Sequence, residues 1–133
     1  MQNILGLDPG RDKCGIAVIN AQGEVVDHQV VDSAETISQI KLLVEKLAID
    51  LIVMGDGTTS KTWRQKIASD LPNLSVTTVN ETNSTLEARD RYWNMYPAMG
   101  LQRLIPQSLR TIPRPVDDIV AIILLERYFA SRS

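Results

Sequence analysis

Short hydrophobic runs separated by turn residues fill the first part of the chain. The runs cover residues 4–7, 15–20 and 24–31, and the first of them stops at the turn sequence Asp8-Pro9-Gly10. Runs of this length are typical of strands, and the short connections between them favour antiparallel neighbours. The pattern therefore predicts a meander of strands whose first member ends at a carboxylate.

The hydrophobic period changes to that of a helix at Ser33, which is the expected N-cap. This helix is expected to end before Asp50, and an uninterrupted apolar run follows at residues 51–54. Such a run is typical of a strand that is buried on both faces. A second helix over residues 60–71 and a strand over residues 74–79 are expected next. The meander is therefore followed by two strand–helix–strand units.

The last third of the chain contains two more helical segments joined by a long connection. Ser84 and Glu87 have the spacing of a capping box, so a helix is expected from Ser84 to about Asn94. Residues 95–115 form a proline-rich connection, and a connection of this length in a compact domain is more often functional than idle. Residues 116–129 are so apolar that the helix they predict must be largely buried.

Strand direction brings distant carboxylates to one edge of the predicted sheet. In a meander the first and third strands point the same way, and helical crossovers keep the next two strands parallel to them. The carboxyl ends of the first and fifth strands carry Asp8 and Glu81, which therefore share an edge. Asp117 joins them if the last helix packs back on the sheet with its N-terminus there. Open α/β sheets bind their ligands at this edge.

Each of these carboxylates also has a local explanation. Asp8 precedes Pro-Gly and suits a turn. Glu81 can be a polar residue at a strand end, and Asp117 and Asp118 favour the positive end of a helix dipole by about 0.3–1 kcal/mol each. Only the convergence of Asp8, Glu81 and Asp117 favours a common site.

Clustered carboxylates need a positive partner, because two unit charges about 4 Å apart repel by about 4 kcal/mol at an effective dielectric of about 20. The chain has one cysteine, Cys14, expected to be a packing residue, and one histidine, His28, which receives no role in an exposed strand. Oxygen ligands alone suit Mg²⁺ or Mn²⁺. Two such ions can activate a water and stabilise a leaving oxygen, so phosphodiester hydrolysis is the expected chemistry.

Length and composition fit a single globular domain over residues 1–133. No apolar run approaches the ~20 residues that a membrane span needs, and no export signal is recognised, so the cytoplasm is the expected location. The formal net charge of −2 counts against a protein that coats nucleic acid nonspecifically. It is compatible with a local basic surface beside an acidic site.

Basic residues gather in two places. The stretch between Asp90 and Asp117 holds no acidic residue and four arginines: Arg91, Arg103, Arg110 and Arg114. The planar fork of arginine donates paired hydrogen bonds to phosphate, so the 95–115 connection is the candidate element for gripping substrate, with a solvated loop as the alternative. Lys61 and Arg64 form a weaker basic group on the second predicted helix, where Lys66 also has the spacing of an ion pair with Asp70.

Three blocks of the sequence resemble, in order and spacing, the motifs of the YqgF (RuvX) family. The blocks are ILGLDPGRDKCGIAVIN, NETNSTLEAR and VDDIVAIILLERYF. The resemblance covers nearly the whole chain and implies a ribonuclease-H-like α/β fold, with a five-stranded mixed sheet flanked by helices. It also implies an activity described as Holliday-junction-resolvase-like or as maturation of pre-16S ribosomal RNA. By position, the family's acidic residues fall on Asp8, Glu81 and Asp117, with Asp118 as a neighbouring candidate ligand.

The sequence departs from the family pattern at two places. Where the family usually reads Asp-Glu-Arg, this chain has Asn80-Glu81-Thr82, which lacks an acid and a base beside the expected ligand. The family's Gly-Leu-Pro loop is replaced by Gly55-Asp56-Gly57. These changes concern substrate contacts more than metal ligation.

The leading hypothesis is a Mg²⁺- or Mn²⁺-dependent endonuclease that cleaves branched DNA or precursor ribosomal RNA, as a monomer or a homodimer. The alternative is a noncatalytic ribonuclease-H-like module that binds nucleic acid or protein. A sugar-kinase or actin-like lobe also begins with an Asp-x-Gly turn. It is disfavoured because it needs a second lobe, for which 133 residues leave no room.

Overall fold

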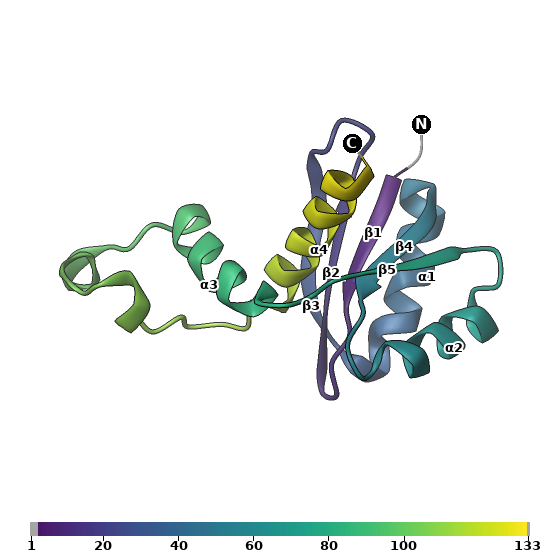
Figure 1. The fold of residues 1–133 in the computed structure, drawn as a ribbon, viewed down its shortest axis with the longest axis horizontal. Helices are drawn as coiled ribbons and strands as arrows, with labels where there is room; N and C mark the ends of the chain where they lie inside the picture. The colour runs from purple at the N-terminus through teal and green to yellow at the C-terminus, as the bar shows by residue number, and fades with distance from the viewer. Residues whose placement is uncertain (1–2, 133) are drawn as a thin grey trace.

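A five-stranded mixed sheet runs through the centre of the protein, for which the computed structural model describes residues 3–132. The strands are β1 (Asn3–Asp8), β2 (Lys13–Ile19), β3 (Val25–Asp32), β4 (Ile49–Gly55) and β5 (Ser75–Val79), in the spatial order β3-β2-β1-β4-β5 (Figure 1). β2 pairs antiparallel with β1 and with β3, whereas β4 pairs parallel with β1 and with β5. The predicted meander followed by parallel strands is therefore confirmed.

Helices cover both faces of this sheet. They are α1 (Thr36–Leu47), α2 (Ser60–Asp70), α3 (Ser84–Met95) and α4 (Asp117–Arg132), with the short 3₁₀ helices η1 (Ser33–Glu35), η2 (Gly100–Leu104) and η3 (Gln107–Leu109). Figure 1 shows α1 and α2 on one side of the sheet and α4 on the other. α3 packs against α4, and residues 96–115, here called the arm, extend with α3 away from the body (Figure 1). The expected helices are all present, with ends that differ by a few residues.

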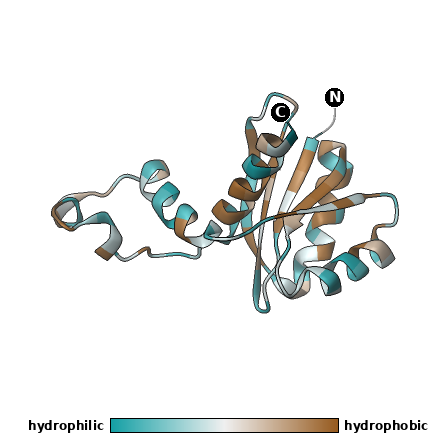
Figure 2. Cartoon of the chain, viewed as in Figure 1, coloured by the Kyte–Doolittle hydropathy of each residue, from teal (hydrophilic) through white to brown (hydrophobic). Residues whose placement is uncertain are grey.

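Alternate residues of β1 face the two layers of the core, because successive side chains of a strand point to opposite faces. Leu5 and Leu7 are fully buried with Ile40 of α1 and Ile67 of α2. The other face packs on α4, whose residues 119–125 are all buried, as expected from their apolar run. The hydrophobic colour in Figure 2 is accordingly concentrated on the strands and on α4. No helix within residues 3–132 has the length and apolar character to cross a membrane.

Two glycines allow α4 to lie directly on the sheet. A Cβ atom at Gly6 would come within 2.6 Å of the carbonyl oxygen of Ala121, and a Cβ atom at Gly15 would come within 1.8 Å of that of Asp117. Any larger residue at either position would push α4 outward. Because Gly15 is the β2 partner of Asp8, the close approach also brings the start of α4 to the end of β1.

Two of the expected helix caps are wrong. Residues 33–35 form η1, so α1 begins only at Thr36, and the Ser33 hydroxyl instead donates to the carbonyl oxygen of Gly10 at 2.8 Å. The N-cap of α3 is Asn83, with a left-handed backbone (φ 60°), and it makes no side-chain cap bond. Ser84 is therefore the first helical residue and is buried, which leaves it outside a capping box.

Candidate active site

Asp8 and Asp117 meet at the carboxyl end of β1. Asp8 is the last residue of β1, and Asp117 is the first residue of α4. The carbonyl oxygen of Asp117 lies against Gly15, the β2 residue that pairs with Asp8. The two side chains are hydrogen-bonded to each other. The last helix does return to this sheet edge, which was the condition for Asp117 to join the site, and it brings together two of the three expected carboxylates.

The surroundings of this pair oppose negative charge. Burial, together with the charges of Asp117 and Glu81 and the hydrogen bond to Asp117, raises the pKa of Asp8 from 3.8 to about 7. Burial likewise raises the pKa of Asp117 above its usual value, although the hydrogen bond with Asp8 acts in the opposite direction. Near neutral pH the pair consequently retains a proton between its carboxylates. A cation bound there would take the place of that proton.

Glu81 follows β5 and lies against the loop that replaces the family's Gly-Leu-Pro sequence. A Cβ atom at Gly57 would be 1.8 Å from Oε1 of Glu81, and one at Gly55 would be 2.7 Å from Oε2. The Glu81 amide also donates to Oδ1 of Asp56 at 3.4 Å. The glycines of this loop thus make room for the Glu81 carboxylate, which is close enough to affect the charge of Asp8.

The donor set fits a hard divalent cation, but the side chains do not form a complete cage. Within residues 3–132, no three His, Cys, Asp or Glu residues are grouped in a way that could hold a metal ion. Asp8 and Asp117 are in contact, whereas Glu81 rests on the glycine loop. The carboxylate oxygens are ligands that suit Mg²⁺ or Mn²⁺, and such an ion would take the place of the proton between Asp8 and Asp117. Asp8, Asp117 and Glu81 are the residues that would hold it.

Asp118, the additional candidate ligand, has other partners. Its carboxylate accepts hydrogen bonds from His28 at 2.7 Å and from Arg114 at 3.1 and 3.3 Å, and also from the amide of Ile119. Its side chain is only 4% exposed, so both oxygens are used inside the protein. Although burial opposes its charge, Arg114 and His28 lower the pKa of Asp118 below its usual value. The expectation that His28 has no role is therefore wrong, because it ties β3 to the start of α4.

The four arginines between Asp90 and Asp117 have different surroundings. Arg91 makes a paired salt bridge with Glu126 of α4, and Arg114 binds Asp118. Arg103 and Arg110 donate to carbonyl oxygens of the arm, at 3.4 and 2.9 Å. Within residues 3–132, neither of these two forms an ion pair with an acid. Arg103 and Arg110 are thus the arm arginines with unneutralised charge.

Among the described residues, the basic residues of α2 form no ion pair with an acid. Lys61 and Arg64 are exposed on the outer side of α2 and line a shallow surface depression. The ammonium group of Lys66 lies 4.5 Å from the ring centre of Trp63, and within the described residues it makes no ion pair with Asp70. The spacing of Lys66 and Asp70 therefore does not produce the salt bridge that it suggests.

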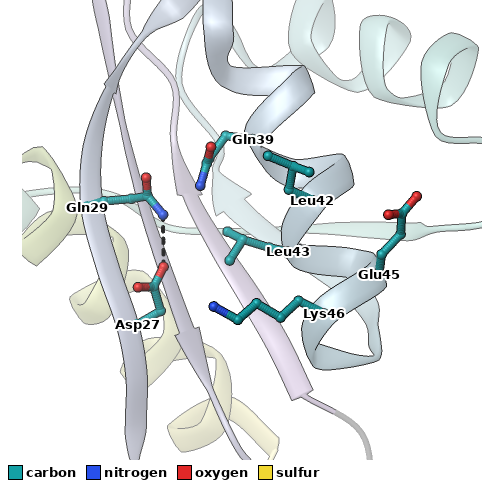
Figure 3. Close-up of a pocket in the computed structure, with 7 residues that line it drawn as sticks. All are labelled: Asp27, Gln29, Gln39, Leu42, Leu43, Glu45 and Lys46. Atoms are coloured by element: carbon teal, nitrogen blue, oxygen red, sulfur yellow. Dashed lines mark hydrogen bonds between the residues drawn. The ribbon is translucent and has the colours of Figure 1, made fainter.

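A surface cavity of about 520 Å³ lies away from the carboxylates. Figure 3 shows that Asp27 and Gln29 of β3 face Leu43 and Lys46 of α1 across it. It opens on the α1 side of the sheet, whereas Asp8 has the same orientation in β1 as Gly6, which faces α4. This cavity therefore does not belong to the carboxylate site.

Sequence reasoning missed three residues that build the site: Gly15, Gly57 and His28. A glycine inside a strand often marks a place where another backbone comes close, and Gly15 within β2 carried that signal. Gly57 belongs to the loop whose sequence differs from the family pattern, so the family motif did not indicate its contact with Glu81. Nothing local in the sequence indicates that His28 reaches Asp118, 90 positions further along the chain.

Comparison with known proteins places this architecture in a family. The family model described as the Tex protein YqgF-like domain matches residues 2–89, well over half of the chain. No curated protein matches the chain by sequence.

Two structures of RuvC from Thermus thermophilus are similar to this one. One is 14% identical, with a TM-score of 0.61 over 98% of this chain and 96% of that chain. The other, of RuvC in complex with Holliday junction substrate, is 15% identical, with a TM-score of 0.56 over 99% of this chain and 96% of that one. The similarity at these identities concerns the fold, which is ribonuclease-H-like. The chain therefore belongs to the family of Tex protein YqgF-like domains and has the ribonuclease-H-like fold expected from its three sequence blocks.

Proposed function

We propose that this protein is a Mg²⁺- or Mn²⁺-dependent endonuclease that hydrolyses phosphodiester bonds of structured nucleic acid. The observation that carries the proposal is the contact between Asp8 and Asp117 at the end of β1, where the pKa of Asp8 is raised to about 7. Such a pair is unfavourable as two bare anions and suits a site that receives a cation. Membership of the YqgF-like family and the fold shared with RuvC support a nuclease-type activity.

The residues of this chain have separate tasks in this mechanism. Asp8 and Asp117 would hold the metal between β1 and α4, and Glu81 would complete the site from the end of β5. A bound divalent ion supplies activation of a water molecule and stabilisation of the leaving oxygen in phosphodiester hydrolysis. The proton shared by Asp8 and Asp117 must leave before the ion binds, so the site is loaded more readily above about pH 7.

The charge and the exposed side chains of the arm suit an extended, phosphate-rich substrate. Arg103 and Arg110 carry free positive charge on a segment that extends from the body (Figure 1). Met99, Leu101 and Leu104 are each more than four-fifths exposed there. Large exposed apolar side chains mark interaction surfaces, and such side chains can wedge between the bases of distorted nucleic acid. The arm is accordingly assigned to gripping the substrate, with Lys61 and Arg64 of α2 as a second basic group.

The test is cleavage of a four-way DNA junction and of precursor ribosomal RNA by the purified protein in Mn²⁺ or Mg²⁺. We expect cleavage of one of them, its loss in EDTA, and its loss in Asp8→Asn. Asp32→Asn, which changes an exposed carboxylate at the end of β3, is the matched control and should retain activity. Cleavage that persists in Asp8→Asn would contradict the mechanism. Ultracentrifugation with and without the junction tests the expected monomer or homodimer.

A second function is favoured by the position of Glu81. Its carboxylate rests on the glycine loop and is flanked by Asn80 and Thr82, and within residues 3–132 it does not form a metal-holding group of three with the other two acids. A noncatalytic module that binds nucleic acid or protein would have this arrangement. Binding of RNA or DNA without cleavage, and without stabilisation by Mn²⁺ or Mg²⁺, would support this alternative over the enzyme.

A further inference from the structure

A groove of about 420 Å³ opens on the α1 and α2 side of the sheet, next to the carboxylate edge. It is lined by residues from three places, the loop after β1, the η1 turn and the start of α2: Gly10, Arg11, Ser33, Ala34, Thr59, Thr62, Trp63 and Lys66. It is separate from the cavity of Figure 3, which lies further along α1. Neither the arm nor the outer basic residues of α2 contribute to it.

Two loops connect this groove with the candidate active site. Gly10 lies two residues after Asp8, and Thr59 lies two residues after Gly57, on which the Glu81 carboxylate rests. Asp8 is oriented toward α4 and the groove toward α2, so the end of the sheet separates them. A strand of substrate that crosses this edge over Asp8 would therefore pass directly into the groove.

The lining is positive and rich in hydroxyl groups. It contains Arg11 and Lys66 and no carboxylate. Arg11 lies 3.6 Å from Asp12, but the two side chains are 93% and 81% exposed, and a pair this exposed is easily exchanged for another anion. Lys66 is held over the ring of Trp63, a contact that orients the ammonium group without neutralising it. Both cations are therefore available to phosphate.

The walls of the groove are held in place independently of any ligand. The Ser33 hydroxyl donates to the carbonyl oxygen of Gly10 at 2.8 Å, and the Ser33 amide donates to Asp12 at 2.9 Å, which fixes the loop after β1 against η1. Trp63 is buried in the core, so the base of the groove is rigid. Thr59 and Thr62, from the start of α2, complete the lining. The groove is therefore largely formed before a ligand arrives.

We propose that this groove binds the phosphodiester backbone of the nucleic-acid strand that is cut, on the side of the scissile bond facing α2, through Arg11 and Lys66. This proposal rests on the proposed nuclease function and adds the path of the substrate. The ligand class is a single strand with consecutive phosphates, because the lining of the groove contains two cations and no carboxylate.

The test is binding of a fluorescent single-stranded oligonucleotide in the Asp8→Asn background, measured by anisotropy over a range of salt concentrations. Each lost phosphate contact reduces the slope of log K against log[salt] by about 0.7 for a single strand. Arg11→Gln/Lys66→Gln should therefore lower the slope by about 1.4 and weaken binding. Thr62→Glu adds a carboxylate to the groove, so it should weaken binding even though Arg11 and Lys66 are both retained.

The matched control is Lys41→Gln/Lys46→Gln, which removes the same charge from α1, away from the groove. Thermal unfolding of each variant checks that the fold is retained. Equal slopes for the groove and control variants would overturn the groove assignment, even if the wild-type protein cleaves nucleic acid. A lower slope for the groove variant, together with no metal-dependent cleavage by the wild type, would support nucleic-acid binding in the groove and contradict the proposed nuclease activity.

Discussion

The carbonyl oxygen of Asp117 lies directly over Gly15, only 1.8 Å from the point where a Cβ atom at Gly15 would be. Gly15 is in turn the strand partner of Asp8. One residue without a side chain therefore sets how closely α4 approaches β1 and how closely the two carboxylates approach each other.

Gly15→Ala is expected to displace the start of α4, because the new methyl group would overlap backbone atoms. Overpacking of this kind costs about 1–3 kcal/mol in the free energy of unfolding. The rise of Tm in Mn²⁺ should be lost as well, since Asp117 moves away from Asp8. Ala17→Gly, a cavity-forming change on the same face of β2, is the control: it should lower Tm and keep the response to Mn²⁺. Equal responses in both variants would argue against this role of Gly15.

Asp8 should make the metal-free protein less stable as the pH rises. Its pKa in the folded protein is about 7, above the ordinary 3.8, so the protonated form stabilises the fold. That contribution is fully present below about pH 4 and is lost as the pH rises through about 7. At about 1.36 kcal/mol for each pKa unit, the loss is up to about 4 kcal/mol. Urea unfolding in EDTA should show this decline in the wild type and a smaller one in Asp8→Asn.

Divalent metal should reverse that decline. Mn²⁺ or Mg²⁺ replaces the proton held by Asp8 and Asp117, so the increase in Tm on adding metal should be small near pH 5 and grow through pH 7. Asp8→Asn should show no such increase at any pH. A pH-independent metal effect that is the same in both proteins would place the metal elsewhere.

The buried carboxylate of Asp118 should matter far more for stability than an exposed one. Asp118→Ala leaves Arg114 and His28 without their partner, and breaking a buried pair costs about 3–5 kcal/mol. Asp32→Ala removes the exposed salt bridge with Lys13 and should cost less than about 1 kcal/mol. Because the pKa of Asp118 is lowered, its contribution should be present at neutral pH and disappear as the pH falls through the acid range. Urea unfolding at pH 7 and at low pH measures both effects.

The arginines between Asp90 and Asp117 should separate into two classes. Arg103→Gln/Arg110→Gln should weaken nucleic-acid binding and reduce the salt slope by about 1.8 on duplex DNA, with little change in Tm. Arg91→Gln should mainly lower Tm, because its guanidinium group is already paired with Glu126. Fluorescence anisotropy and thermal unfolding on the same proteins separate the two effects. A larger binding loss for Arg91→Gln than for the double variant would contradict the assignment.

The order of the elements and the direction of the strands could be predicted from the sequence, because they depend on local hydrophobic period and on the short or helical connections between strands. The apolar run from Ile119 to Leu125 required a buried helix, and the structure buries it between the sheet and α3. The meeting of Asp8 and Asp117 at one sheet edge depended in addition on the return of the last helix to that edge, which strand direction alone does not fix. Helix starts were less predictable, since the Ser33 hydroxyl binds the loop after β1 rather than its own helix.

By itself, the sequence determined the order of the elements and the direction of the strands, since hydrophobic pattern and connection length are properties of the chain. Tertiary structure alone decided which of the charged groups are free to act. His28 of β3 binds Asp118, 90 positions further along the chain, and the Glu81 carboxylate rests against Gly55 and Gly57. Lys66 lies over an aromatic ring beside a groove whose walls come from distant segments. The distribution of free and paired charge depends on contacts between residues far apart in sequence, which no local pattern records.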